Sequence, residues 1–365
     1  MIEQLPYAIT PKYNFPKALQ DLQLPQNFMD LSLRSMKTLR SERFRPVEAD
    51  LFNSETENHA QAKSTLLDYG SPSFHSIPLK PLPQPTTITA IDVSNIRLGE
   101  TDTGLLTAIR AAVVWRQKRQ YKYLRLGPFP FHITEQNKQE VYDIFRQHYL
   151  PTSPKCLVAP SLPNMQNRIG NLLERWLQMS MSAGSRDNII LWDGSLTAGT
   201  PDNPTRALLQ LLEITRNRLN TVLAFTKSTT LRLWNRRLTD LTTRTPPPRL
   251  IQINRYPLHQ STPICFLGNI YIAKLTNGSC SFRLDIDKNI PSAQRVAAVQ
   301  KLLGNDLLFQ GYPETLRLAH IYSTFTANEV LGIQRFIAQT YGLRVVTRLN
   351  LRRLLFGPYG KGPEA

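Results

Sequence analysis

The segment that most constrains the fold is Ile-Ile-Leu-Trp-Asp-Gly-Ser-Leu at residues 189–196. Its apolar run is short and continuous, which is typical of a buried parallel strand. Open α/β sheets bind their ligands just beyond the carboxyl ends of such strands, where Asp193 stands. Gly194 permits a sharp turn there, or the close approach of a phosphate. Asp-Gly is also an ordinary turn signal, so this segment by itself predicts either a turn or an acid presented at a sheet edge.

A second strand that ends in an acid lies upstream. Residues 86–92, Thr-Thr-Ile-Thr-Ala-Ile-Asp, are β-branched and finish at Asp92. We expect a turn-rich piece at 94–104 to follow, and further strands at residues 108–116, 120–126 and 221–225 and in a hairpin of 264–275 with 280–286. Successive strands without helices between them predict that an antiparallel meander opens the sheet.

The clearest amphipathic helix is expected at residues 164–181. Ile169, Leu172, Leu173 and Leu177 share one face at helical spacing, with Glu174 at the margin of that stripe. Other helices are expected at residues 19–39, 136–149, 204–220, 231–241, 292–303, 313–320 and 328–340. The pattern predicts an α/β fold in which a mixed sheet is flanked by helices.

Three regions are expected along the chain. Residues 1–85 form an N-terminal appendage, partly helical and partly irregular, that ends in Pro-Leu-Pro-Gln-Pro. Residues 86–343 hold the strands and helices of the main domain. Residues 344–365 form a basic C-terminal tail.

The charge of the chain indicates a polyanionic partner. Its 365 residues include 44 Lys and Arg against 27 Asp and Glu, which gives a formal net charge of +17. Such an excess favours nucleic acid, although a basic surface without a ligand has the same composition. Cys156, Cys265 and Cys280 form no CxxC pair, which argues against a zinc site or a disulfide framework. With no secretory signal and no apolar run of membrane-spanning length, we expect a cytoplasmic protein.

Three carboxylates follow or flank the predicted strands. Asp92 and Asp193 end strands, and Glu174 lies on the helix before the second of them. Each alone is an ordinary turn or surface residue, but together they can converge on Mg²⁺ or Mn²⁺, which prefer carboxylate oxygens. Two such ions can hold the attacking water and the leaving oxygen of a phosphodiester.

Basic residues follow the strand at 221–225. Lys227 stands just beyond it, where it can reach a phosphate or remain a surface lysine. Arg232 and Arg236 lie on the predicted helix 231–241 and can follow phosphates or form a solvated face.

Three further residues have a structural and a chemical interpretation. His320 lies on a predicted helix, where a histidine is commonly packed or exposed rather than catalytic. Tyr312 precedes a proline and can cap that helix. Asp285 can be an outer ligand or pair with Arg283. GxxxxGK[ST], GxGxxG and GxSxG are absent, so the sequence signals neither a nucleotide-cradling loop nor a serine nucleophile.

Four motifs, taken in order, resemble those of the NurA family of nucleases. They are Ala-Ile-Asp-Val-Ser at 90–94, Leu-Trp-Asp-Gly-Ser-Leu at 191–196, Ala-Phe-Thr-Lys-Ser at 224–228, and Gly-Tyr-Pro with Leu-Arg-Leu-Ala-His within 311–320. The resemblance covers about residues 86–325. Val93 departs from the glycine that usually follows the first aspartate, and Asn95 stands where a basic residue is common.

The resemblance implies an RNase H-like core and a manganese-dependent deoxyribonuclease. Such proteins are 5′ to 3′ exonucleases and single-strand endonucleases that process DNA ends in recombinational repair. They form homodimers and dock on a hexameric HerA-type translocase. Residue by residue, the motifs imply metal ligands at Asp92 and Asp193, a site completed by Tyr312 and His320, and a substrate contact at Lys227.

The third acid rests on position rather than on a motif. Glu174 is the expected ligand, for two Mn²⁺ or Mg²⁺ ions, and Glu213 on the next helix is its rival. Other functions fit the same residues. The chain can be a non-catalytic nucleic-acid-binding protein on an RNase H-like scaffold, a structural subunit of a translocase complex, or a ribonuclease.

Overall fold

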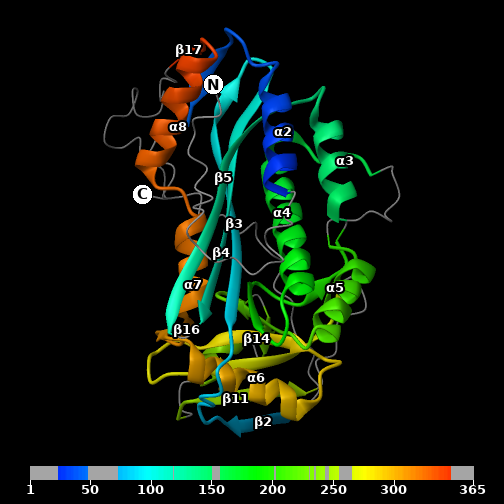
Figure 1. The fold of residues 1–365 in the computed structure, drawn as a ribbon, viewed down its shortest axis with the longest axis vertical. Coiled ribbons are helices and arrows are strands. Elements are labelled where there is room, and N and C mark those ends of the chain that lie inside the picture. Colours follow the sequence, from blue (N-terminus) through cyan, green and yellow to red (C-terminus); the bar gives the residue numbers. More distant parts are fainter. Residues whose placement is uncertain are drawn as a thin grey trace.

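The protein is described by a computed structural model that covers residues 24–47, 73–117, 119–149, 157–200, 203–229, 231–233, 236–242, 246–254 and 265–346. These residues form a mixed α/β fold around an 11-stranded sheet. Three long antiparallel strands open the sheet: β3 (Ile88–Thr101), β4 (Gly104–Gln117) and β5 (Gln120–Thr134). The predicted meander is therefore confirmed, and Figure 1 shows its strands running along the length of the molecule.

The expected turn at residues 94–104 is wrong. β3 continues to Thr101 and pairs with β4 up to Glu100 and Leu105, with one register shift between Arg97 and Gly99. The turn is confined to Asp102 and Thr103. Polar residues suggested a loop, but β4 is buried along nearly its whole length and its backbone groups need a partner strand.

Two parallel strands continue the sheet beside β3. These are β6 (Ile189–Asp193) and β8 (Thr221–Thr226), both parallel to their neighbours in the order β3-β6-β8. Four antiparallel strands follow: β14 (Phe282–Asp287), β13 (Gly268–Lys274), β11 (Arg249–Asn254) and β2 (Ser73–Pro78). The predicted mixed sheet and its hairpin, which β13 and β14 form, are thus confirmed.

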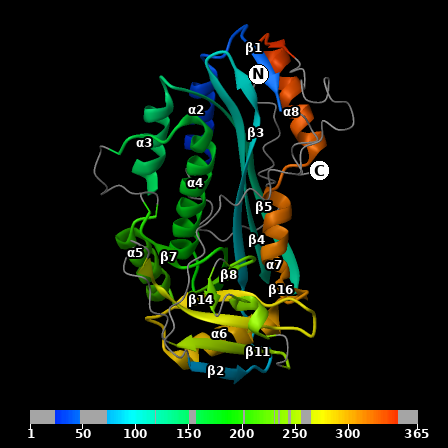
Figure 2. The same ribbon diagram turned by 180° about the vertical axis from the view of Figure 1, so that it is seen from behind.

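Helices cover both sides of the long strands. Figures 1 and 2 show α2 (Leu24–Met36), α3 (Lys138–Tyr149) and α4 (Leu162–Gly184) on one side, and α7 (Glu314–Ser323) and α8 (Ala327–Thr340) on the other. Two further helices, α5 (Thr205–Asn217) and α6 (Ser292–Asn305), lie beside the shorter strands. The predicted helices other than 231–241 are confirmed within a few residues at each described end, and residues 19–23 of the helix expected at 19–39 lie outside the described ranges.

The strands place their side chains in separate cores. Ile189 and Leu191 of β6 join the cluster under α6 and α7, whereas Ile190 and Trp192 join the cluster under α5. This alternation is the period of two that a strand buried on both faces requires. Asp193 continues the row of Ile189 and Leu191, so it is directed toward the side of α7.

The expected helix at 231–241 is wrong. Its described residues form β9 (Arg232–Leu233), β10 (Arg236–Arg237) and a 3₁₀ turn, Leu238–Thr242. Leu231 and Leu238 are buried against β11 and β13, and this packing overrides the helical pattern of the local sequence.

Short strands complete the description. They are β1 (Arg43–Pro46), β7 (Thr197–Ala198), β12 (Cys265–Phe266), β15 (Leu308–Phe309), β16 (Tyr312–Pro313) and β17 (Arg344–Val345). β1 pairs with β3 and β17, and β2 pairs with β11, so parts of the segment before residue 86 belong to the sheet. The domain boundaries stay a prediction, and residues 1–23, 48–72 and 347–365 lie outside the described ranges. Among the described helices, we find none with the length and apolarity needed to cross a membrane.

Candidate active site

The two aspartates come from neighbouring parallel strands. Ala90 pairs with Leu191 and Ile91 with Trp192, so Asp92 and Asp193 occupy the next positions of β3 and β6. Asp92 is buried, with 8% of its surface exposed, and Asp193 is partly buried. Asp193 ends β6, whereas Asp92 was expected to end its strand but lies within β3. The buried run of residues before each acid sets its height in the sheet.

The turn after Asp193 is held in place by three hydrogen bonds. Gly194 has a φ of +120°, which favours glycine, and its N–H donates to the Phe225 carbonyl over 2.7 Å. The Thr226 hydroxyl donates to the Gly194 carbonyl over 2.7 Å, and the Leu196 N–H donates to Oδ2 of Asp285 over 3.0 Å. The strand end that carries Asp193 is therefore fixed from both sides.

Asp285 has a structural part in this arrangement. Both of its oxygens accept hydrogen bonds from Arg283, over 2.7 and 2.6 Å, and the side chain is fully buried. Of the two interpretations of the sequence, the pair with Arg283 is the one that the structure has.

Helix α7 brings His320 against Asp92. Nδ1 of His320 lies 3.4 Å from Oδ2 of Asp92, and the Ser323 hydroxyl donates a short hydrogen bond to the same oxygen. One ligand atom each from Asp92, Asp193 and His320 can be chosen so that all lie within 4.8 Å of one another. The side chains from β3, β6 and α7 thus form one compact group, here named the acidic cluster.

Lys227 adds a positive charge to the edge of the acidic cluster. Its Nζ lies 2.7 Å from Oδ2 of Asp193 and 5.7 Å from the centre of the Tyr312 ring. Burial raises the pKa of Asp193, while the ammonium of Lys227 acts in the opposite direction. Half of this lysine remains accessible to solvent, so its ammonium can also meet a bound anion.

Glu174 of α4 lies close enough to respond to both aspartates. Burial, with a smaller contribution from the charges of Asp92 and Asp193, raises the pKa of Glu174 to about 7, and Arg175 opposes this shift. Oε1 of Glu174 accepts a hydrogen bond from Gln178 over 2.8 Å. Glu174 is not a member of the compact group of ligand atoms, whereas His320 is. The rival Glu213 is exposed on α5.

Tyr312 directs a buried hydroxyl toward this region. Its ring packs against Phe225 and Phe282, and the residue is 7% exposed. Burial and the charges of Asp193 and Asp92 raise the pKa of the hydroxyl, so it stays protonated and can donate. Among the described residues the hydroxyl has no hydrogen-bond partner, which leaves its proton for a bound ligand.

The residues present fit a divalent cation. Carboxylate oxygens and an imidazole nitrogen are ligands that Mn²⁺ accepts, and clustered carboxylates repel one another unless a cation or protons neutralise them. The pKa values of Asp193 and Glu174 are raised by burial and by repulsion from neighbouring carboxylates, and a bound cation would offset this repulsion.

The two arginines predicted to bind substrate lie on a small hairpin. Arg236 of β10 is exposed and Arg232 of β9 is partly buried. Both follow Lys227 closely along the chain, and their part in substrate binding stays a prediction.

Sequence reasoning missed three polar residues that support the acidic cluster. Ser323 contacts Asp92, Ser94 contacts Ser323, and Gln178 contacts Glu174. A signal was present for two of them, because Ser323 follows His320, and Gln178 follows Glu174, at the spacing that places residues on one helix face.

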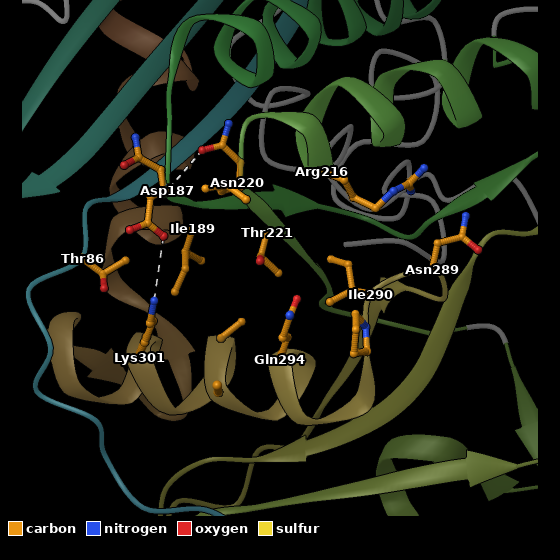
Figure 3. A pocket seen from close by; sticks show the side chains of 15 residues that line it. Thr86, Asp187, Ile189, Arg216, Asn220, Thr221, Asn289, Ile290, Gln294 and Lys301 are labelled. Atoms are coloured by element: carbon orange, nitrogen blue, oxygen red, sulfur yellow. Dashed lines mark hydrogen bonds and ion pairs between the residues drawn. The ribbon is translucent and has the colours of Figure 1, made fainter.

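A cavity of about 380 Å³ lies elsewhere in the molecule. Figure 3 shows that it is lined by residues at the amino ends of β6 and β8, including Ile189 and Thr221, and by Gln294 and Lys301 of α6. Asp193 stands at the opposite, carboxyl end of β6. The cavity is therefore separate from the acidic cluster.

No family model and no curated protein matches the chain. Among solved structures, it is similar to the NurA nuclease from Sulfolobus solfataricus, with 16% identity, a TM-score of 0.46, and coverage of 90% of this chain and 98% of that one. A second NurA structure has 11% identity and a TM-score of 0.35 over 82% of this chain and 93% of that one. Endonuclease V from Bacillus subtilis has 11% identity and a TM-score of 0.31, with coverage of 72% of this chain and 88% of that one.

Proposed function

We propose that the protein is a metal-dependent nuclease that hydrolyses phosphodiester bonds of DNA. The observation that carries the proposal is the meeting of Asp92 and Asp193 on adjacent parallel strands, with ligand atoms of these two and His320 within 4.8 Å. Two carboxylates at the same height on neighbouring strands, one of which ends there, are suited to holding divalent cations where a ligand can approach.

The residues that would hold the metal are Asp92, Asp193 and Glu174, with His320 beside them. Divalent ions, Mn²⁺ or Mg²⁺ and two in number, would supply activation of water and neutralisation of the charge that develops on the phosphate. The chain's own contribution is to fix the carboxylates before the substrate arrives, through the hydrogen bonds that hold the turn after Asp193.

Two side chains are suited to contact the substrate phosphate. Lys227 can turn from Asp193 toward a phosphate oxygen, since it is half exposed at the edge of the cluster. The Tyr312 hydroxyl is buried, protonated and without a partner among the described residues, so it can donate to a phosphate oxygen or to a water. His320 is exposed on α7 and can hold the scissile phosphate or accept a proton.

The net charge of +17 supports a nucleic-acid substrate. Basic residues outside the cluster, with Arg232 and Arg236 among them, would hold the backbone without reading its sequence. Cleavage and binding should therefore both weaken as the salt concentration rises.

The resemblance of the four motifs to the NurA family supports a more specific proposal about the type of nuclease activity. We propose 5′ to 3′ exonuclease and single-strand endonuclease action in the processing of DNA ends during recombinational repair. We also propose a homodimer that works with a HerA-type hexameric translocase, and Mn²⁺ as the preferred ion. Co-purification with such an ATPase, together with the mass of the particle in solution, tests the partner and the dimer.

The experiment that tests the nuclease compares Asp193→Asn with the wild-type protein. Binding of labelled linear DNA and its cleavage in Mn²⁺ are measured on the same preparations, with RNA as a second substrate. We expect the variant to lose cleavage and to keep its affinity for DNA. Glu213→Gln, which changes an exposed acid on α5, is the matched control and should cleave normally. Binding without cleavage by the wild-type protein would instead favour a non-catalytic nucleic-acid-binding subunit.

A further inference from the structure

A buried serine connects α7 to the first aspartate. The Ser323 side chain is fully buried, and its hydroxyl donates to Oδ2 of Asp92. Its oxygen also lies 3.0 Å from the hydroxyl of Ser94, which stands two positions after Asp92 on β3. Serine, serine and aspartate thus form a continuous chain of hydrogen bonds inside the protein.

The direction of the protons in this chain follows from its last member. An ionised carboxylate can only accept, so Ser323 must donate to Asp92. Because a hydroxyl has one proton, Ser323 can then act only as an acceptor toward Ser94, which becomes the donor of the second bond. The His320 carbonyl, 3.0 Å from Ser323, is the competing acceptor within the helix. The bond that Ser94 donates polarises the Ser323 hydroxyl and so makes it a stronger donor. This favours its hydrogen bond to the charged Asp92 over the one to the His320 carbonyl.

The two bonds determine how Asp92 presents its oxygens. Oδ2 is occupied by Ser323 and faces Nδ1 of His320, and in the described part of the chain no hydrogen bond reaches Oδ1. A carboxylate held at one oxygen loses the freedom to rotate, so the second oxygen keeps one direction. The outer partners of metal ligands commonly fix orientation in this way.

We propose that Ser323, supported by Ser94, is a positioning residue that holds Asp92 in the orientation needed to bind the metal. The proposal rests on the proposed function, since it concerns the same acidic cluster. It predicts an effect on metal affinity rather than on DNA affinity, because Ser323 is fully buried and Ser94 acts through Ser323.

The test measures Mn²⁺ binding without DNA, by the paramagnetic resonance signal of free Mn²⁺, and then cleavage as a function of Mn²⁺ concentration. Ser323→Ala should raise the Mn²⁺ dissociation constant about tenfold, and Ser94→Ala by a smaller factor. The double variant should be little worse than Ser323→Ala, because Ser94 acts through Ser323. Saturating Mn²⁺ should restore most of the cleavage rate, with KM for DNA unchanged.

Ser35→Ala is the matched control. Ser35 is also buried and hydrogen-bonded, but to the backbone of Ser32 and His132 on the far side of the molecule from α7. It should lose thermal stability without any change in Mn²⁺ binding. If Ser323→Ala does not fold, Ser94→Ala alone carries the test.

The outcomes separate the two proposals. Unchanged Mn²⁺ binding in both serine variants, with a wild-type protein that binds Mn²⁺ and cleaves DNA, overturns the positioning role alone. A wild-type protein that neither binds Mn²⁺ nor cleaves DNA overturns the proposed function and this inference with it. A weaker Mn²⁺ affinity in the serine variants, equal to that of the Ser35 control, shows general destabilisation and also overturns the positioning role.

Discussion

Lys227, one residue beyond β8, places its Nζ 2.7 Å from Oδ2 of Asp193 at the end of β6. The two residues are far apart in the sequence but follow adjacent parallel strands, so the sheet itself sets their separation. The contact lowers the energy of a carboxylate that burial disfavours. It also places a partly exposed positive charge at the edge of the acidic cluster.

The first prediction concerns a variant that lacks the positive charge of Lys227. Lys227→Met should reduce cleavage by roughly a hundredfold, as expected when a donor to the developing charge is lost. Lys227 opposes the upward shift in the pKa of Asp193, so without it that pKa rises further. The acid side of the pH–rate profile should therefore move to higher pH. Lys288→Met, an exposed lysine after β14, is the control. An unshifted profile with a normal rate would remove Lys227 from the site.

The second prediction concerns the stability of the metal-free protein. The pKa of Glu174 is raised from 4.5 to about 7, so between these values the unfolded chain releases a proton that the folded protein retains. The free energy of unfolding therefore falls as pH rises through this window, by on the order of 3 kcal/mol from this group. Glu174→Gln should lose that dependence.

Urea unfolding in EDTA from pH 4.5 to 8 measures the effect. The variant should match the wild-type protein at the acid end and become the more stable one at the alkaline end. A difference between the two proteins that stays constant with pH would show that Glu174 is not held in this environment.

The third prediction concerns the buried hydroxyl of Tyr312. Tyr312→Phe keeps the ring contacts with Phe225 and Phe282 and removes a hydroxyl that has no partner among the described residues. The free energy of unfolding should therefore fall by less than about 1 kcal/mol, or rise. The rate of cleavage should fall at least tenfold, because one hydrogen-bond donor in the site is lost. The comparison is Tyr271→Phe, whose hydroxyl lies near Arg295 instead of the acids. Normal cleavage by Tyr312→Phe would assign this tyrosine to packing.

The sequence predicted the parts of the fold that have a strong local pattern. Asp193 was expected at a strand end because it follows a short apolar run, and the amphipathic stripe around Leu172 identified α4. The expected strand end at Asp92 was wrong, because β3 continues to Thr101. The resemblance of the motifs implied that both acids bind the metal. The parallel pairing of β3 with β6, which brings the two acids together, is not determined by single-sequence periodicity.

The remaining features depend on contacts between distant segments. Residues 94–101 became a strand because β4 supplied a partner, against their polar local pattern. Leu231 and Leu238, on either side of the β9–β10 hairpin, became buried because β11 and β13 offered an apolar surface. Ser323 could be placed near Asp92 only after α7 was known to pack on β3. Tertiary contacts of this kind override local propensity.

The central claim is that the acidic cluster uses a divalent metal to cleave DNA. The most direct test incubates end-labelled linear DNA with the purified protein in Mn²⁺, Mg²⁺ or EDTA, beside Asp92→Asn. The account predicts degradation in Mn²⁺, none in EDTA, and none by the variant, which should still bind the DNA. Cleavage that persists in EDTA, or a variant that cleaves at the wild-type rate, would contradict it.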